Sequence, residues 1–206
     1  MNRTYPRVFL ARHGETAWSL SGRHTGVTDL PLTESGRRDA RQLGERLRGL
    51  RFAAVFSSPL QRAWSTCELA GFAAKASADP DLVEWNYGAY EGMTPQEIRQ
   101  RRPDWEIFRD GCPQGEPLEN LAIRAERVLA RVRDVDGDVL LFSSGHILRV
   151  LAARWLRFDA TAARGLFLDT ATLSILGHYH DEYDPVIYLW NERVRATHPG
   201  ERTDAN

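Results

Sequence analysis

The sequence predicts an α/β fold: a three-layer α/β/α sandwich whose central sheet is mostly parallel and contains one antiparallel strand. Short apolar runs alternate with amphipathic helical patterns along most of the chain, which is typical of a parallel sheet with helices on both faces. Near the C-terminus, the strand-like segments ATLSILGHYH and PVIYLWNE flank the turn DEYDP. A hairpin of this kind requires at least one antiparallel strand.

Three apolar runs are expected to form buried strands of the parallel part. They cover residues 7–11, 53–57 and 138–142. Each is a short, nearly continuous stretch of apolar side chains, which is the pattern of a strand buried on both faces. The carboxyl ends of these strands should therefore meet at one edge of the sheet.

Four helices are expected between and after these strands. The segment LTESGRRDARQLGERLRGL is amphipathic, because its apolar side chains recur at helical spacing: Ala40, Leu43, Leu47 and Leu50. Thr33 is suited to cap this helix, and Pro59 is suited to open the second one. The third and fourth helices are expected over residues 118–132 and 147–155.

The composition indicates one globular domain spanning residues 1–206. The hydrophobic share of 42% and the net charge of −1 are typical of a globular chain and argue against a nucleic-acid partner, which calls for a basic surface. No apolar run approaches the ~20 residues of a membrane span, so we expect a cytoplasmic protein without a membrane partner. Cys67 and Cys112 are too few and too isolated to form a disulfide framework or a metal site.

Polar segments follow the three predicted strands. They read RHG at 12–14, SPLQR at 58–62 and SSGH at 143–146. Ligands of open α/β sheets bind at the carboxyl ends of strands, so these arginine, histidine and serine side chains are expected to converge. Guanidinium groups match the geometry of phosphate oxygens, which predicts a phosphate-handling site.

The motifs in these segments resemble those of the histidine phosphatase superfamily, which includes cofactor-dependent phosphoglycerate mutases and many acid phosphatases. They are RHGE followed by T and W, GRHTGVTDLPLTESG, SPLQRA and LVEWNYGAYEG. The resemblance covers roughly residues 7 to 180 and is greatest for the small acid phosphatase and sedoheptulose-bisphosphatase-like branch. It implies a phosphoglycerate mutase-like fold and a phosphomonoesterase that hydrolyses small phosphorylated metabolites such as sugar phosphates, without a metal or cofactor.

The resemblance also implies roles for individual residues. His13 would be the nucleophile that forms a phosphohistidine, and Arg12 and Arg62 would clamp the phosphoryl oxygens. Glu84 would donate a proton to the leaving oxygen and later activate water. The substrate pocket would be lined by Ser19, Thr25, Gly26 and Tyr87.

The segment LFSSGHILR departs from the family pattern. Aligned on Gly145, it places Ser144 where the family carries its second histidine, and His146 follows. Two alternatives stay open. Either His146 contacts the phosphate and partly fills the role, with Ser144 and Gly145 beside it, or the protein is a weakened or non-catalytic phosphate-binding homologue. We favour retained activity, because the other motif residues are all present.

The stretch 86–116 is rich in Gly, Pro and charge, and we expect a lid-like insertion over the site. Phosphoglycerate mutases carry a longer insertion here, with a lysine and an arginine pair. Residues 88–116 of this chain contain no lysine. This absence favours hydrolysis, and mutase-type phosphoryl transfer is the alternative function.

Three further features bear on metal binding, nucleotide binding and assembly. His178 and His180 in GHYHDEYD are the only candidates for a metal site, and alternation along a hairpin strand explains them equally well. A nucleotide-binding protein would need a glycine-rich loop that the chain lacks. The apolar strand PVIYLW is suited to pair with a second copy, which predicts a homodimer.

Overall fold

The computed structural model describes residues 6–180 and 184–193, which form one six-stranded sheet with the order β3-β2-β4-β1-β5-β6. Strands β1 to β4 are parallel to one another, whereas β5 is antiparallel to both of its neighbours, β1 and β6. The predicted mostly parallel sheet with one antiparallel strand is confirmed. The strands are β1 (Val8–Arg12), β2 (Ala54–Ser57), β3 (Ala76–Ala78), β4 (Val139–Ser143), β5 (Thr172–His178) and β6 (Pro185–Arg193).

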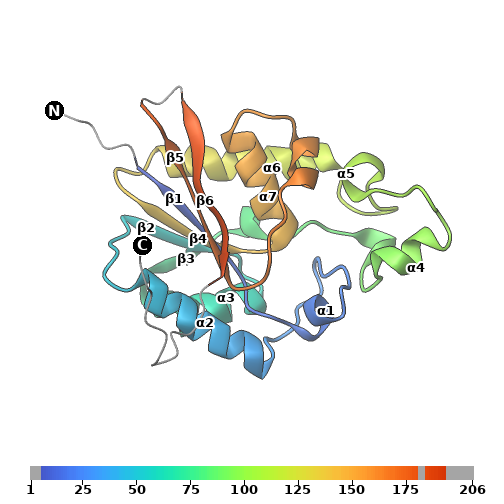
Figure 1. Cartoon of the computed structure of the whole chain (residues 1–206), viewed down its shortest axis with the longest axis horizontal. Coiled ribbons are helices and arrows are strands. Elements are labelled where there is room, and N and C mark those ends of the chain that lie inside the picture. The colour runs from blue at the N-terminus through green and yellow to red at the C-terminus, as the bar shows by residue number, and fades with distance from the viewer. Residues whose placement is uncertain (1–5, 181–183, 194–206) are drawn as a thin grey trace, which may run out of the picture.

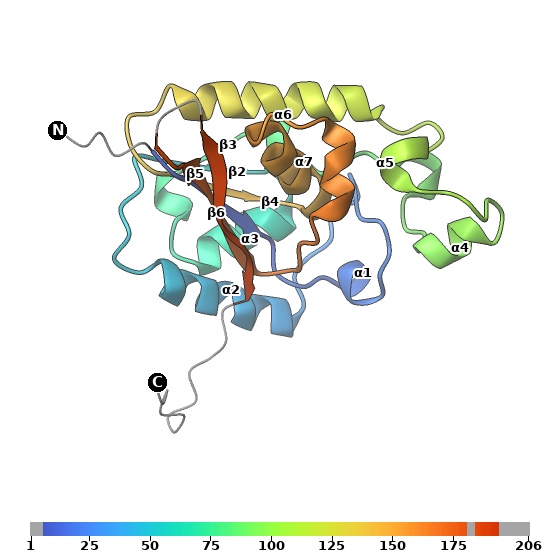
Figure 2. The ribbon, with the colours of Figure 1, turned by 45° about the horizontal axis from the view of Figure 1, so that its top comes forward.

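Helices cover both faces of the sheet, as Figures 1 and 2 show. On one face lie α2 (Glu34–Leu47) and α3 (Gln61–Leu69); on the other lie α6 (Leu118–Arg133) and α7 (Gly145–Trp155). The shorter helices are α1 (Ala17–Leu20), α4 (Pro95–Arg99), α5 (Ile107–Asp110), η1 (Ala73–Lys75), η2 (Pro80–Leu82), η3 (Gly88–Tyr90) and η4 (Ala160–Gly165). No helix among the described residues has the length and apolar character needed to cross a bilayer.

Strand β1 shows how the sheet buries both faces. Val8 and Leu10 pack into the core cluster that contains residues of α6 and α7. Phe9 and Ala11 point the other way, into the cluster that contains Leu43 of α2. All four are almost completely buried, in keeping with the central position of β1 in the sheet.

The helix boundaries follow local signals closely. Thr33 caps α2 as expected, since its Oγ1 accepts the N–H of Gly36 at 3.0 Å. The helix ends at Leu47, earlier than the apolar spacing predicted, and α3 begins two residues after Pro59. Strand β3 was not predicted, because it is a three-residue edge strand with little buried apolar surface. Residues 181–183 of the predicted DEYDP turn lie outside the described residues.

The predicted insertion, residues 86–116, forms the lobe that carries α4 and α5 at the right of Figure 1. Its apolar side chains do not form a separate core. Ile98, Trp105 and Phe108 are buried in the same cluster as Trp85 and the residues of α6 and α7. The lobe is therefore attached to the main body by shared packing.

Candidate active site

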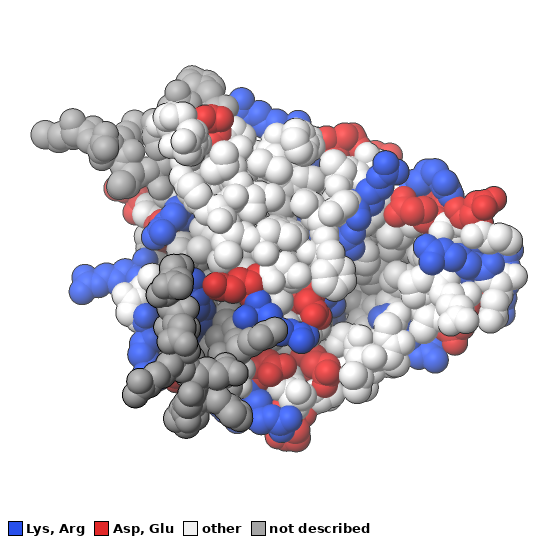
Figure 3. Space-filling view, viewed as in Figure 1, with Lys and Arg blue, Asp and Glu red and all other residues white. Residues whose placement is uncertain are grey.

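A cavity of about 200 Å³ lies at the carboxyl ends of β1 and β4. Figure 3 shows the surface hollowed between the main body and the lobe that carries α4 and α5. The described residues that line the cavity are Arg12, His13, Ser19, Gly22, Arg23, His24, Thr25, Glu84, Tyr87, Gly145, His146, Arg149 and Leu168. Three arginines and three histidines thus face a single carboxylate, so the cavity is suited to an anionic ligand.

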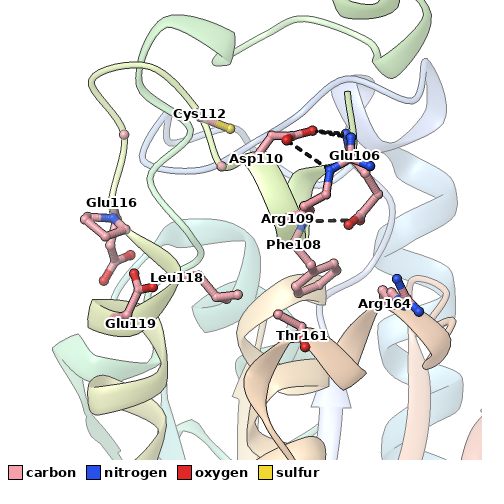
Figure 4. A pocket seen from close by; sticks show the side chains of 13 residues that line it. Glu106, Phe108, Arg109, Asp110, Cys112, Glu116, Leu118, Glu119, Thr161 and Arg164 are labelled. Atoms are coloured by element: carbon pink, nitrogen blue, oxygen red, sulfur yellow. Dashed lines mark hydrogen bonds and ion pairs between the residues drawn. The ribbon is translucent and has the colours of Figure 1, made fainter. Parts of the chain in front are cut away.

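A larger cavity of about 570 Å³ lies between the insertion and η4 (Figure 4). Among the described residues, its lining carries four carboxylates (Glu106, Asp110, Glu116 and Glu119) against two guanidinium groups (Arg109 and Arg164), so it is poorly suited to an anion. Arg109 pairs with Asp110 at 2.7 Å, and the Glu106 carboxylate accepts the backbone N–H of Phe108 at 3.1 Å. The smaller cavity is therefore the better candidate for the active site, although it has less volume.

His13 directly follows β1 and is almost completely buried. Its Nδ1 donates a hydrogen bond to the carbonyl oxygen of Gly14 at 2.7 Å, which leaves Nε2 as the nitrogen with a free lone pair. Burial, together with the charges of Arg12 and Arg62, holds the pKa of His13 well below its ordinary value of 6.5. The imidazole is therefore neutral at neutral pH, which is the form able to attack phosphorus.

The turn after β1 needs a glycine at position 14. A Cβ on Gly14 would lie 2.4 Å from the carbonyl oxygen of Gly36, so the two backbones approach too closely for any side chain. The N–H of Gly14 donates to Thr66 Oγ1 at 3.0 Å. These contacts fix the turn that orients the His13 ring.

Arg12 presents an unneutralised charge to the cavity. Its Nη1 donates to the carbonyl oxygen of Leu168 at 2.5 Å, and its Nε is buried without a hydrogen-bond partner. Among the described residues, no carboxylate lies within ion-pair distance of it. Gly145 packs against the guanidinium, since a Cβ there would lie 3.3 Å from Arg12 Cζ. A guanidinium that has no ion-pair partner and an unsatisfied Nε is suited to a bound anion.

Arg62 is fully buried and holds the loop 25–28. Its Nη2 donates to the carbonyl oxygens of Gly26 at 2.7 Å and Thr25 at 3.1 Å, and Nη1 donates to that of Thr28 at 2.9 Å. On the other side of the loop, Glu91 Oε1 accepts the N–H groups of Gly26 and Thr28. This loop, whose Thr25 lines the cavity, is thus held between a guanidinium and a carboxylate.

Glu84 caps the N-terminus of α7 with its carboxylate. Oε1 accepts the N–H groups of Trp85 at 2.9 Å and Ile147 at 3.0 Å, and Oε2 accepts that of His146 at 2.9 Å. Ser144, at the N-cap position, makes no side-chain capping bond. The helix therefore fixes the carboxyl group in the cavity wall, with Oε2 accepting the fewer hydrogen bonds.

Two further histidines line the cavity without carrying charge at neutral pH. The Nδ1 of His146 lies 2.6 Å from the hydroxyl of Tyr87, and burial together with Arg149 lowers the pKa of His146 well below 6.5. Burial lowers the pKa of His24 to about 4, and its Nε2 is buried without a hydrogen-bond partner.

The structure brings most of the predicted site residues to this cavity. Those in its lining are Arg12, His13, Ser19, Thr25, Glu84, Tyr87, Gly145 and His146. Arg62, Gly26 and Ser144 lie directly behind the wall instead, where the Nε of Arg62 donates to Ser144 Oγ at 3.4 Å. Ser19 faces the cavity with its hydroxyl engaged, since Oγ accepts from the N–H of Thr16 and donates to its carbonyl oxygen.

Sequence reasoning missed five lining residues: Gly22, Arg23, His24, Arg149 and Leu168. Arg149 could have been found, because it follows His146 by three residues on α7 and so shares its face of the helix. His178 and His180, the candidate metal ligands, do not line this cavity. The His178 ring packs on Trp155, and among the described residues no group of three or more potential ligands is placed to hold a metal ion.

A neutral histidine beside the guanidinium of Arg12, at the carboxyl edge of an α/β sheet, is suited to the transfer of a phosphoryl group. The sequence matches the family model of the histidine phosphatase superfamily (branch 1) over residues 8–193. The chain belongs to the histidine phosphatase superfamily, and it is a phosphoric monoester hydrolase.

Individual relatives agree with this assignment. An acid phosphatase of Mycobacterium tuberculosis is 38% identical over 178 residues, covering 84% of this chain and 87% of the relative. A sedoheptulose 1,7-bisphosphatase of Saccharomyces cerevisiae is 36% identical over 182 residues, covering 73% of this chain and 67% of the relative. A solved structure of an open reading frame from Mycobacterium tuberculosis superposes with a TM-score of 0.87 at 35% identity, over 92% of this chain and 99% of that one. The predicted phosphoglycerate mutase-like fold is thereby confirmed.

Proposed function

We propose that the protein hydrolyses small sugar phosphates through a phosphohistidine on Nε2 of His13. The observation that carries the proposal is the state of this imidazole. Its Nδ1 is engaged with the Gly14 carbonyl oxygen, its pKa is depressed, and it lines the cavity beside Arg12. A neutral, oriented nitrogen next to a guanidinium meets the two needs of phosphoryl transfer, which are a nucleophile and compensation of oxygen charge.

In the first step, Nε2 of His13 attacks phosphorus in line. The N–P bond forms, the ester P–O bond breaks, and the leaving oxygen takes a proton from Glu84. The guanidinium of Arg12, with its unpartnered Nε, stabilises the equatorial oxygens as the charge spreads over them. The product alcohol then leaves the cavity.

In the second step, the Glu84 carboxylate accepts a proton from water. The water oxygen bonds to phosphorus while the N–P bond breaks, and inorganic phosphate is released with the imidazole neutral again. The proton that Glu84 gives to the leaving oxygen in the first step is thus returned to Glu84 from water in the second. Its three backbone hydrogen bonds hold the carboxyl group in place through both steps.

The cavity supports a small substrate with more than one anionic group. At about 200 Å³ it is smaller than the ≈300–1,000 Å³ of drug-sized ligand sites. Arg149 lines it and stacks on Phe108 at 4.8 Å, while its side chain donates only to the carbonyl oxygens of Ala163 and Arg164 among the described residues. This second guanidinium is suited to a further phosphate or a carboxylate. The names of the two relatives, an acid phosphatase and a sugar bisphosphatase, fit such a substrate.

A substrate panel tests the proposal. Sugar monophosphates, sugar bisphosphates and 3-phosphoglycerate, the last with bisphosphoglycerate supplied, would be assayed for free phosphate and for isomerised product. We expect free phosphate, a preference for a sugar bisphosphate, and a loss of roughly 10³-fold or more in His13→Gln. His180→Gln, which alters an exposed histidine outside the cavity, is the matched control. Isomerisation of 3-phosphoglycerate without phosphate release would contradict the proposal.

We also infer a cytoplasmic homodimer. Cys67 and Cys112 are free thiols, in keeping with a reducing compartment. Strand β6 lies at the edge of the sheet, and Tyr188 is about half exposed on it, so a second copy could extend the sheet there. Light scattering tests the assembly: a dimeric mass that Tyr188→Lys converts to a monomeric one supports it, and a monomeric mass for the unaltered protein overturns it.

A further inference from the structure

The residue that replaces the family's second histidine cannot serve the phosphoryl group from its place in this structure. Ser144 is completely buried behind the cavity wall, and its Oγ accepts a hydrogen bond from Arg62 Nε at 3.4 Å. His146, two residues further along α7, lines the cavity. The cavity therefore contains His146, two residues after the position at which the family carries its second histidine.

The hydrogen bond between Tyr87 and His146 has a definite direction. The two groups lie 2.6 Å apart, and both are neutral at neutral pH, because burial raises the pKa of Tyr87 well above 10 and lowers that of His146 well below 6.5. Tyr87 is almost fully buried, and the His146 ring is the hydroxyl's only hydrogen-bond partner among the described residues. If Nδ1 were the donor, the phenol proton would be left without an acceptor, which is costly in a buried site. The phenol therefore donates to Nδ1.

This direction decides the tautomer of His146. When Nδ1 accepts, the single proton of the neutral ring must sit on Nε2. Nε2 makes no hydrogen bond to any described residue, and the ring is held between Trp85, at 5.9 Å between ring centroids, and Phe108, at 5.3 Å. The result is an oriented N–H donor in the wall of the cavity that contains His13.

We propose that Tyr87 is a positioning residue that holds His146 as an Nε2–H donor to the phosphoryl group, replacing the donor that Ser144 cannot supply. The inference rests on the proposed function, because it assumes that the phosphoryl group binds beside His13. Loss of a preorganised donor to developing oxygen charge costs roughly 10²–10³-fold in rate. His146→Ala should therefore lose about 10²-fold in kcat. Tyr87→Phe should lose less, about 10-fold, because the freed ring still samples the Nε2–H tautomer.

The test places Tyr87→Phe in two backgrounds, the natural chain and Ser144→His, with Tyr90→Phe as the matched control. Tyr90 lies in the same lobe and does not contact His146. We expect Tyr87→Phe to lower kcat about 10-fold in the natural chain and less than about 2-fold beside Ser144→His, where the restored histidine supplies the donor. Equal losses in both backgrounds would overturn the inference. Phosphorylation of His13 during turnover is measured in every variant; its absence would instead refute the proposed function.

A second measurement does not depend on Ser144→His folding. Long-range 1H–15N NMR correlations report which ring nitrogen of His146 carries the proton. We expect a protonated Nε2 in the natural protein, a mixture of tautomers in Tyr87→Phe, and a shift of the Nε2 signal on adding inorganic phosphate. A protonated Nδ1 in the natural protein, or an Nε2 signal unmoved by saturating phosphate, would overturn the inference.

Discussion

The Nδ1 of His13 lies 2.7 Å from the carbonyl oxygen of Gly14, the residue that follows it. A carbonyl oxygen only accepts, so the proton of the neutral ring is on Nδ1, and the free lone pair is on Nε2. His13 therefore needs no catalytic base to activate it, because its neutral ring already has a free lone pair on Nε2. The same contact depends on the close approach of Gly14 to Gly36, which sets the path of the chain after β1.

The depressed pKa of His13 predicts the pH profile. Protonation of Nε2 would remove the nucleophile, and burial holds the pKa of His13 well below 6.5. We therefore expect kcat/KM, corrected for the substrate's own second ionisation near pH 6, to show no loss with an apparent pKa near 6.5. Steady-state rates from pH 8 to pH 4.5 measure this. An acidic limb centred near 6.5 after that correction would mean that His13 has an unperturbed pKa.

Arg149 is predicted to act on substrates with a second anionic group. Hydrogen bonds to charged groups contribute about 1.5–3 kcal/mol, so Arg149→Gln should lower kcat/KM for a sugar bisphosphate about 10- to 100-fold. The rate with p-nitrophenyl phosphate, which carries one phosphate, should change less than about 3-fold. Arg164→Gln, in the wall of the larger cavity, is the control and should leave both rates unchanged. Equal losses with both substrates would place Arg149 at the reacting phosphate.

Gly145 is predicted to be needed for the position of the Arg12 guanidinium. A Cβ at this position would lie 3.3 Å from Cζ and 3.4 Å from Nε of Arg12, so the guanidinium would have to move by a few tenths of an ångström. Gly145→Ala should therefore lower kcat/KM about 10-fold, with a small change in the free energy of unfolding. At Gly165 a Cβ meets nothing within 4 Å, and Gly165→Ala is the control. Activity equal to the control's would show that Arg12 tolerates the shift.

His24 is predicted to make stability depend on pH. Its pKa is about 4 in the folded protein and about 6.5 in the unfolded chain, so between these values the unfolded state binds more protons. The free energy of unfolding therefore falls as the pH drops below 6.5, by about 1.4 kcal/mol per pH unit from this group. Between pH 7 and pH 4.5, the free energy of unfolding measured in urea titrations should fall by roughly 2–3 kcal/mol less in His24→Asn than in the natural protein. If the free energy of unfolding falls equally in the two proteins, the folded protein binds a proton at His24 as readily as the unfolded chain does.

Much of the fold could be predicted from the sequence because its signals are local. Continuous apolar runs marked β1, β2 and β4, and Thr33 marked the start of α2 within one residue. Strand β3 carried no such signal, since its pairing with β2 does not depend on buried side chains of its own. The end of α2 was placed too late, because Leu50 continues the apolar spacing although the backbone turns at Gly49, where φ is +82°.

The site was predictable where it depends on strand ends and less so where it depends on loops. The carboxyl ends of β1 and β4 bring His13 and His146 to one cavity, as their sequence positions indicated. Arg62 also follows a strand, but its guanidinium is committed to the carbonyl groups of loop 25–28, a contact between distant segments that no local pattern reports. Glu84 capping α7 is a contact of the same kind.

Isolation of the phosphoenzyme tests the central claim most directly. The protein would be mixed with a sugar bisphosphate, quenched in base within one turnover and digested, and the phosphopeptide mapped by mass spectrometry and 31P NMR. We expect one phosphoryl group on Nε2 of His13, formed and lost at rates that account for turnover, and none in His13→Gln. Turnover without that intermediate, or a phosphoryl group on Nδ1 or on His146, would contradict the account.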